Sequence, residues 1–342
     1  MGDQKIEIKL AFIAGLKEVV INEIKKHPNF HIAREGLDSV YLDLIKDISE
    51  IKNLRSVSKA YIILQNPKYN PLYISNHKSI LGSLIDIVIN KNEDDFRSFK
   101  ITCSGADSPE VRNISSYIQE KYKLTEKEDA DMKIHLIKSD ETWEIGVQIT
   151  PRPLSLRDYK IMHMGGAMDP TIAYAMNSLC ELENASSYLN IFSGSATLLI
   201  EAGRCYENLK RSVGFDNEKK HISLAMQNIQ KAGLIRKIEL KEKDIFDKPD
   251  LGKFDAITSD LPFGMTISKD EDLEKLYQCF IEYCEEALND NGVLAVYTNE
   301  HEMLKKIIQN SKFKIIKTLD LKFMTSAGAY LRPKIFVCKL EN

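Results

Sequence analysis

Seven short apolar segments alternate with longer amphipathic segments in the second half of the chain, and no other feature constrains the fold as strongly. Short, buried strands separated by helices are typical of a parallel, doubly wound α/β sheet. The helix before the first strand is expected to begin at Asp169 and Pro170, because aspartate is a common N-cap and proline is favoured at the first helical position. The predicted strands are residues 188–192, 213–215, 237–240, 254–259, 293–298, 313–319 and 334–340.

The first 150 residues follow a different pattern, in which short strands and amphipathic helices alternate without a glycine-rich turn. Residues 5–65 predict the order strand, helix, strand, helix, strand, which indicates a small ferredoxin-like unit. A second small α+β unit follows, with a helix that Ser108 caps and Pro109 opens. The predicted boundaries are 1–68 and 69–150 for these two units, 151–166 for a proline-stiffened linker and 167–342 for the α/β domain.

The composition excludes several classes of protein. Hydrophobic residues make up 43% of the 342 residues and charged residues 28%, as in a folded domain. No apolar run approaches the roughly 20 residues that cross a bilayer, and no signal peptide is recognisable, so we expect a cytoplasmic protein. The six cysteines form no CxxC pair, which predicts reduced thiols and no metal site. The net charge of −3 means that any nucleic-acid contact must come from a local basic patch.

The turn after the first α/β strand, in NIFSGSATLLIE at residues 190–201, is rich in small residues. Small residues let a ligand approach the backbone, and the following helix offers free N–H groups at its N-terminus. A turn that needs glycine only for its geometry explains the same pattern. The small residues are Ser193, Gly194, Ser195 and Ala196.

Two acids follow the next two strands, at the edge of the sheet where α/β proteins bind ligands. Asp216 is suited to accept hydrogen bonds from both ribose hydroxyls of a nucleoside, although a helix N-cap is an equally good interpretation. Asp244 could accept from an adenine amine, and alone it would be interpreted as a loop aspartate.

The segment FDAITSDLPFG, residues 254–264, is the most informative. Proline directly after a buried strand forces a rigid turn and leaves preceding carbonyl groups without donors from the chain. A planar base could stack on Phe263 while Asp260 and the Leu261 carbonyl accept from its exocyclic amine, with Pro262 helping to fix the plane.

Together these motifs resemble a known family. DLPFG, GSATLLIEAG at 194–203 and the two acids resemble class I S-adenosylmethionine-dependent methyltransferases that modify exocyclic amines. SLRDYK at 155–160 and GGAMDPTIAYAM at 165–176 resemble the THUMP-domain RNA guanine-N2 methyltransferases, and residues 98–150 resemble the THUMP module itself. The resemblance implies a Rossmann-like catalytic domain preceded by ferredoxin-like and THUMP-like units.

The same resemblance implies transfer of a methyl group to guanosine N2 in tRNA, in the acceptor stem and of the position 6 type. Its catalytic segment is Asp260, Leu261, Pro262 and Phe263. The cofactor contacts it implies are Ser193, Gly194, Ser195, Ala196, Thr197, Glu201, Asp216, Asp244 and Ile245. The family's first motif commonly reads DPFCGSGT, so Asn190 and Ala196 depart from it.

Basic residues of the linker and of the C-terminal region are the expected RNA contacts, and we expect a monomer. They are Arg152, Arg157, Lys160 and His163 of the linker, Lys210 and Arg211 before the second strand of the α/β domain, and Arg332 and Lys334 near the C-terminus. Three alternatives remain open: guanine-N2 or adenine-N6 methylation of ribosomal RNA, a catalytically silent RNA-binding protein, and a small-molecule methyltransferase. The last leaves the first 150 residues without a purpose.

Overall fold

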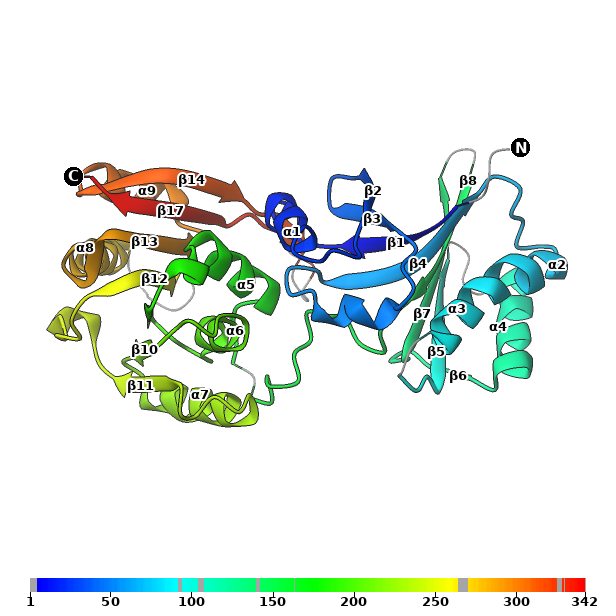
Figure 1. Ribbon diagram of the computed structural model, residues 1–342, viewed down its shortest axis with the longest axis horizontal. Coiled ribbons are helices and arrows are strands. Elements are labelled where there is room, and N and C mark those ends of the chain that lie inside the picture. The colour runs from blue at the N-terminus through cyan, green and yellow to red at the C-terminus, as the bar shows by residue number, and fades with distance from the viewer. Residues whose placement is uncertain are drawn as a thin grey trace. The chain divides into compact units, whose positions relative to one another are not determined.

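The structure is a computed structural model that describes residues 5–91, 94–103, 108–139, 142–162, 164–263, 270–324, 328 and 330–341 (Figure 1). The chain divides into two compact units. The first comprises residues 1–12 and 20–155, and the second comprises residues 13–19 and 156–342.

One sheet, in the order β2-β3-β1-β4-β8-β7-β5-β6, organises the described residues of the first unit. Strand β5 runs parallel to β6 and β7, whereas the other neighbours are antiparallel. The strands are β1 (Ile6–Ala11), β2 (Ile32–Glu35), β3 (Ser39–Asp43), β4 (Lys59–Asn66), β5 (Ser98–Cys103), β6 (Thr125–Glu126), β7 (Met132–Ser139) and β8 (Thr142–Gln148). The helices in this part of the chain are α1 (Lys17–Ile24), the 3₁₀ helix η1 (Ile48–Asn53), α2 (Ile74–Asn76), the π-helical turn η2 (His77–Leu81), α3 (Gly82–Asn90) and α4 (Pro109–Tyr122).

Strand β2 and the expected second helix are two of the differences between the first unit and the sequence prediction. Strand β2 was missed because it alternates half-buried and exposed residues at the sheet edge and contains no apolar run. The expected second helix is only the short η1, which Asp47 begins by accepting the Ser49 N–H at 2.9 Å. The cap of α4 is confirmed, since the Ser108 side chain accepts from the Val111 N–H and Pro109 follows it.

All seven strands predicted for the second unit are present. Their order is β11-β10-β9-β12-β13-β17-β14. The strands are β9 (Ser187–Ile191), β10 (Arg211–Asp216), β11 (Ile238–Glu242), β12 (Phe254–Asp260), β13 (Leu288–Thr298), β14 (Phe313–Asp320) and β17 (Lys334–Leu340). The sheet is parallel as predicted except at β17, which runs antiparallel to both β13 and β14.

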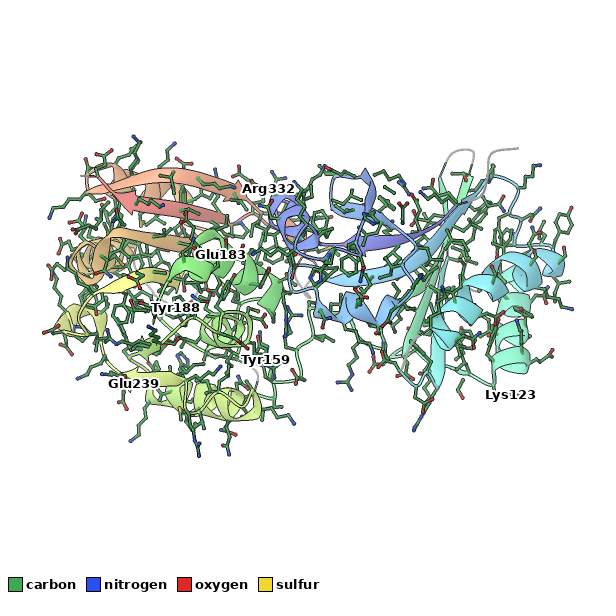
Figure 2. All side chains as sticks on the ribbon, in the orientation of Figure 1. Lys123, Tyr159, Glu183, Tyr188, Glu239 and Arg332 are labelled. Carbon is green, nitrogen blue, oxygen red and sulfur yellow. The ribbon has the colours of Figure 1, made fainter. Side chains whose placement is uncertain are left out.

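Helices cover both faces of this sheet (Figure 1). Successive residues of a strand point to opposite faces. The Tyr188 hydroxyl donates to Asn177 of α5 at 3.0 Å, and Figure 2 shows Tyr188 inside the domain. Its neighbour Leu189 packs with Phe280 of α8 and Leu304 of α9. The helices are α5 (Pro170–Leu179), α6 (Thr197–Cys205), α7 (Lys219–Lys231), α8 (Asp270–Ala287) and α9 (His301–Gln309).

Several sequence expectations concern local features of the described residues. Asp169 does cap α5, by accepting the Thr171 N–H at 2.7 Å. The cysteines are free thiols, and Cys180, Cys284 and Cys338 are buried. Across the described ranges no cluster of three His, Cys, Asp or Glu side chains could hold a metal ion. None of the helices in those ranges has both the length and the apolar character that crossing a membrane requires.

Candidate active site

The turn between β9 and α6 has a strained backbone. Phe192, Gly194 and Ala196 all have positive φ angles, of 55°, 49° and 63°. Only glycine adopts this left-handed region without steric cost, and such strain is concentrated at functional sites. Alanine at position 196, where the family commonly has glycine, strains the backbone because of this positive φ. The Ala196 methyl group has no accessible surface, so it does not crowd the surface that a ligand would meet.

The carboxylate of Asp216, at the end of β10, is engaged by three donors. Its Oδ2 accepts the Gly194 N–H at 2.9 Å, and its Oδ1 accepts from the Glu218 N–H at 3.1 Å. His221 Nδ1 lies 3.0 Å from the same Oδ1. Asp216 is only 6% exposed. It therefore ties the turn after β9 to the start of α7, a role that the sequence did not reveal.

A second carboxylate at this strand end was missed by sequence reasoning. Glu218 occupies the N-cap position of α7, yet its side chain makes no capping hydrogen bond, and the residue is exposed. Its position two residues beyond the end of β10 was the only signal that could have found it. Two acids, one buried and one exposed, therefore share the end of β10.

Asp244 lies at the end of the neighbouring strand β11, where the sequence placed it. It caps the 3₁₀ helix η4 (Ile245–Asp247) by accepting the Phe246 N–H at 2.9 Å. Ile245 is 2% exposed and packs into the core, whereas the adjacent Phe246 is 58% exposed. A half-buried carboxylate thus stands next to an exposed aromatic ring, which the sequence reasoning did not single out.

The segment after β12 is anchored from both sides. The Leu261 N–H donates to the Tyr297 carbonyl at 3.0 Å, and the Tyr277 hydroxyl donates to the Pro262 carbonyl at 2.9 Å. Among the described residues none donates to the Leu261 carbonyl. Phe263 is half-buried, and Gly264 lies outside the described residues, as does His163 of the linker. The arrangement leaves one backbone acceptor beside the Asp260 carboxylate.

Burial raises the pKa of Asp260 to about 7, and the nearby Lys160 ammonium opposes this rise. The Lys160 Nζ donates to the Met168 carbonyl at 2.7 Å, and burial lowers the pKa of Lys160. Lys160 was predicted to contact RNA. The structure places it half-buried and within electrostatic range of Asp260, whose pKa it lowers against the effect of burial.

A buried ion pair joins the linker to α6. Arg157 Nε lies 3.0 Å from Glu201 Oε1, and the Tyr159 hydroxyl donates to the same oxygen at 2.8 Å (Figure 2). The side chains of Arg157 and Glu201 are 5% and 0% exposed. The RNA contact predicted for Arg157 and the cofactor contact predicted for Glu201 would both require this pair to open.

Asn228 of α7 fastens the linker to the turn after β9. Its side chain accepts the Met162 N–H at 2.9 Å and donates to the Ser195 carbonyl at 3.2 Å. A Cβ atom on Gly194 would lie 2.9 Å from the Met164 methyl group. Gly194 is therefore needed both for its positive φ and for the space that Met164 occupies.

The remaining polar residues of the turn are largely buried. Ser193 donates to the Asn190 carbonyl, and the hydroxyls of Ser195 and Thr197 are 3.0 Å apart. Asn190 donates to the Thr258 carbonyl, while its own Oδ1 is buried and has no partner among the described groups. An unsatisfied buried acceptor costs about 1–3 kcal/mol, so Asn190 carries a local energetic cost at the end of β9.

The groups at the carboxyl edge of the sheet fit a nucleoside cofactor that carries a positive charge. Carboxylates follow β10, β11 and β12, whose carboxyl ends meet at one edge because these strands are parallel to β9 or to its neighbours. Such acceptors suit hydroxyl and amine donors, and the Asp260 carboxylate suits a neighbouring cation. The sheet order, with its one antiparallel strand, and this edge define a class I Rossmann-like methyltransferase fold.

Residues 157–327 match the family model described as UPF0020, RMKL-like, methyltransferase domain. The chain belongs to this family.

Two curated relatives and one crystal structure illustrate the similarity. The bovine (Bos taurus) U6 snRNA (guanine-N(2))-methyltransferase THUMPD2 is 30% identical over 178 residues, which cover 51% of this chain and 34% of the relative. The tRNA (guanine(6)-N2)-methyltransferase of Archaeoglobus fulgidus is 22% identical over 236 residues, 62% of this chain and 59% of the relative. The chain thus spans less than two thirds of either relative. The crystal structure of TrmN from Thermus thermophilus has a TM-score of 0.76 at 21% identity and covers 98% of this chain and 100% of that one, which shows a shared fold.

Proposed function

We propose that this chain transfers a methyl group from S-adenosylmethionine to N2 of a guanosine in RNA. We propose further that this guanosine lies in the acceptor stem of tRNA, as in methyltransferases of the position 6 type. The observation that carries the proposal is the pair of acceptors after β12, the Asp260 carboxylate and the Leu261 carbonyl. The names of the relatives support the choice of atom, since both act on guanine N2.

The chemical difficulty is that the lone pair of an exocyclic amine is delocalised into the base. Hydrogen bonds from the amine to Asp260 and to the Leu261 carbonyl would raise electron density on nitrogen and orient it. Phe263 and Pro262 would fix the plane of the base, so that positioning and electrostatics supply most of the rate. The target base must leave its helix to reach this edge, which costs a few kcal/mol.

The cofactor supplies an electrophilic methyl group on a sulfonium, and the chain's own residues hold the atoms around it. As the bond from N2 to the methyl carbon forms and the carbon–sulfur bond breaks, N2 must lose one proton. The Asp260 carboxylate is the acceptor within reach, and its pKa of about 7 lets it take up and release that proton near neutral pH. Asp244 and the acids after β10 are proposed to receive the adenine amine and the ribose hydroxyls.

We assign one proposed role to each of the predicted segments of the chain. Residues 1–68 would form a ferredoxin-like unit, 69–150 a THUMP-like RNA-binding unit, 151–166 the linker and 167–342 the catalytic domain. Arg152 and Arg332 are exposed and remain available for phosphate contacts. We propose that the protein works in the cytoplasm as a monomer on tRNA.

Transfer of labelled methyl to a panel of unmodified RNAs tests the proposal. The panel contains tRNA transcripts, a U6 snRNA transcript, because relatives carry that name, and ribosomal RNA fragments. Digestion of the products to nucleosides should yield N2-methylguanosine from tRNA, and Asp260→Asn should abolish it while cofactor binding persists.

Each other result has a definite meaning. Label on U6 or ribosomal RNA alone would show that this RNA, and not tRNA, is the substrate. N6-methyladenosine as the product would show that the target atom is adenine N6 and not guanine N2. Binding of RNA without binding of S-adenosylmethionine would make the chain a silent RNA-binding protein and would refute the proposed activity.

A further inference from the structure

A small hairpin interrupts the path from β14 to β17. Its strands are β15 (Phe323–Met324) and β16 (Tyr330–Leu331), which pair antiparallel with Met324 opposite Tyr330 and Phe323 opposite Leu331. Residues directly opposite one another share a face, and so do residues two apart along a strand. The register therefore places Lys322 and Arg332, which flank the two strands, on the same face as Met324 and Tyr330.

That face is exposed and combines an aromatic ring with cations. Met324 is 62% exposed and Tyr330 is 65% exposed. The Lys322 ammonium lies 5.2 Å from the centre of the Tyr330 ring, which verifies the shared face. Within the described residues no acidic side chain pairs with Lys322 or with Arg332, which lies just before β17 (Figure 2).

The hairpin lies at the same edge of the sheet as the candidate active site. Asp260 at the end of β12 lies opposite Tyr297 of β13, and the next residue, Thr298, lies opposite Lys334 of β17. Lys334 in turn lies opposite Asp320, the last residue of β14. Three strand spacings separate β12 from β14, a distance of roughly 14 Å. Nucleotides close to a target base could span that distance.

The charge of this region contrasts with that of the whole chain. Residues 312–334 contain six cations and one acid, Asp320, whereas the chain has a net charge of −3. The cations are Lys312, Lys314, Lys317, Lys322, Arg332 and Lys334. Lys312 pairs with Glu285, Lys317 with Glu18 and Lys334 with Asp320. Of the other three cations, Lys322 and Arg332 flank the hairpin and are available to an outside partner.

We infer that the face formed by Lys322, Met324, Tyr330 and Arg332 binds an unpaired nucleotide of the RNA substrate, beside the target base. The base would stack on Tyr330, with Met324 at its edge, while Lys322 and Arg332 contact the flanking phosphates. Aromatic platforms flanked by cations are how proteins hold single-stranded nucleic acid. This inference rests on the proposed function and adds a second site of contact with RNA, away from the candidate active site.

RNA fits this face better than a second protein does. One tyrosine and one methionine offer far less apolar area than a stable protein interface buries. The two cations without acidic partners complement a phosphate backbone, which dominates the affinity of nucleic-acid binding. Tyr330 and Arg332 also lie beyond residue 327, where the match to the family model ends.

The test measures binding of the full chain to a labelled tRNA transcript over a series of salt concentrations. Tyr330→Ala should weaken binding about 5- to 100-fold with an unchanged salt dependence, since it removes stacking alone. Tyr330→Phe should retain the wild-type affinity. Arg332→Gln and Lys322→Gln should each lower the slope of log affinity against log salt by about one. The control is Lys231→Gln, an exposed lysine at the end of α7, which should change neither quantity.

A transcript containing 4-thiouridine provides a direct readout. Irradiation should attach RNA to the peptide that contains Tyr330. Wild-type binding that Tyr330→Ala leaves unchanged would overturn this inference and spare the proposed function. Crosslinking of the RNA to other peptides alone, and not to the peptide that contains Tyr330, would also overturn it. Failure of the wild-type chain to bind any RNA would refute the proposed function as well.

Discussion

The carboxylate of Asp216 accepts the backbone N–H of Gly194 at 2.9 Å, across 22 residues of sequence. This bond joins the end of β10 to the strained turn after β9. Because Asp216 also receives the Glu218 N–H and faces His221, most of its acceptor capacity is used within the protein. The carboxylate that shapes the turn and the carboxylate that holds a ribose can therefore be two different residues.

Substituting Asp216 and Glu218 one at a time should separate the effect on stability from the effect on cofactor affinity. Asp216→Asn replaces an acceptor oxygen with an amide donor that faces N–H groups, so we expect a loss of about 1–3 kcal/mol in the free energy of unfolding. Glu218→Gln should leave stability unchanged, because its side chain makes no capping bond, and should weaken S-adenosylmethionine binding. Urea unfolding and calorimetric titration measure the two effects. Unchanged cofactor affinity in Glu218→Gln would return the ribose contact to Asp216 alone.

The buried pair of Arg157 and Glu201 should behave as a unit. Glu201→Gln removes the carboxylate that faces Arg157, whose side chain is only 5% exposed. We therefore expect the variant to lose about 3–5 kcal/mol of unfolding free energy. Arg157→Met combined with Glu201→Leu should recover most of that loss, because no charge then remains buried. Denaturant unfolding of the two single variants and the double variant gives the coupling energy. Additive losses would show that the two side chains act independently.

Methyl transfer should depend on pH through Asp260. The ionised carboxylate is the proposed acceptor, and its pKa is raised to about 7 by burial. The value of kcat/KM for the cofactor should therefore fall roughly tenfold per pH unit below pH 7, because this ratio reports on the free enzyme. Lys160→Met removes a cation that favours the ionised form, so the pKa should rise and the profile should move to higher pH. A profile that Lys160→Met does not move would remove Asp260 as the titrating group.

Ala196→Gly should be tolerated, because Ala196 is the N-cap of α6 and glycine is more favourable than alanine at that position. Alanine with a φ of 63° bears a left-handed cost of roughly 1–2 kcal/mol, while glycine loses about 0.5–1 kcal/mol through the freedom of its unfolded chain. We expect equal or slightly greater stability in thermal unfolding. Ala196→Val should be strongly destabilised, because a branched side chain fits neither the φ angle nor the buried site. Ala202→Gly, within α6 itself, is the matched control and should lose stability.

The pattern of the sequence predicted the second unit more completely than the first. Five of the seven strands of its large sheet are mostly buried and apolar, so each of these is visible as a short run, whereas β11 and β14 also contain exposed residues. The caps at Asp169 and Ser108 depend only on neighbouring residues. Strand β2 was invisible because it is an edge strand with half-buried residues. The antiparallel direction of β17 was also hidden, since a strand's direction depends on where its partners lie.

For the candidate site, the sequence located the strand ends but not the partners of their side chains. Asp216, Asp244 and Asp260 all lie where the motif positions placed them. The sequence could not show that Lys160 interacts electrostatically with Asp260, or that Arg157 and Glu201 pair across 44 residues. Such contacts join segments that only the packed chain brings together.

For the α/β domain, the sequence by itself determined the local structure: which segments form the strands of its large sheet, where the helix after Asp169 begins, and which acids follow the strands. These features depend on periodicity and capping, which act between residues a few positions apart. Only the tertiary structure decided the strand order, the engagement of Asp216 by three donors, the burial that raises the pKa of Asp260, and the shared face of Lys322 and Tyr330. Burial and hydrogen bonding between distant residues exist only when the chain has folded, because water satisfies the same groups before that.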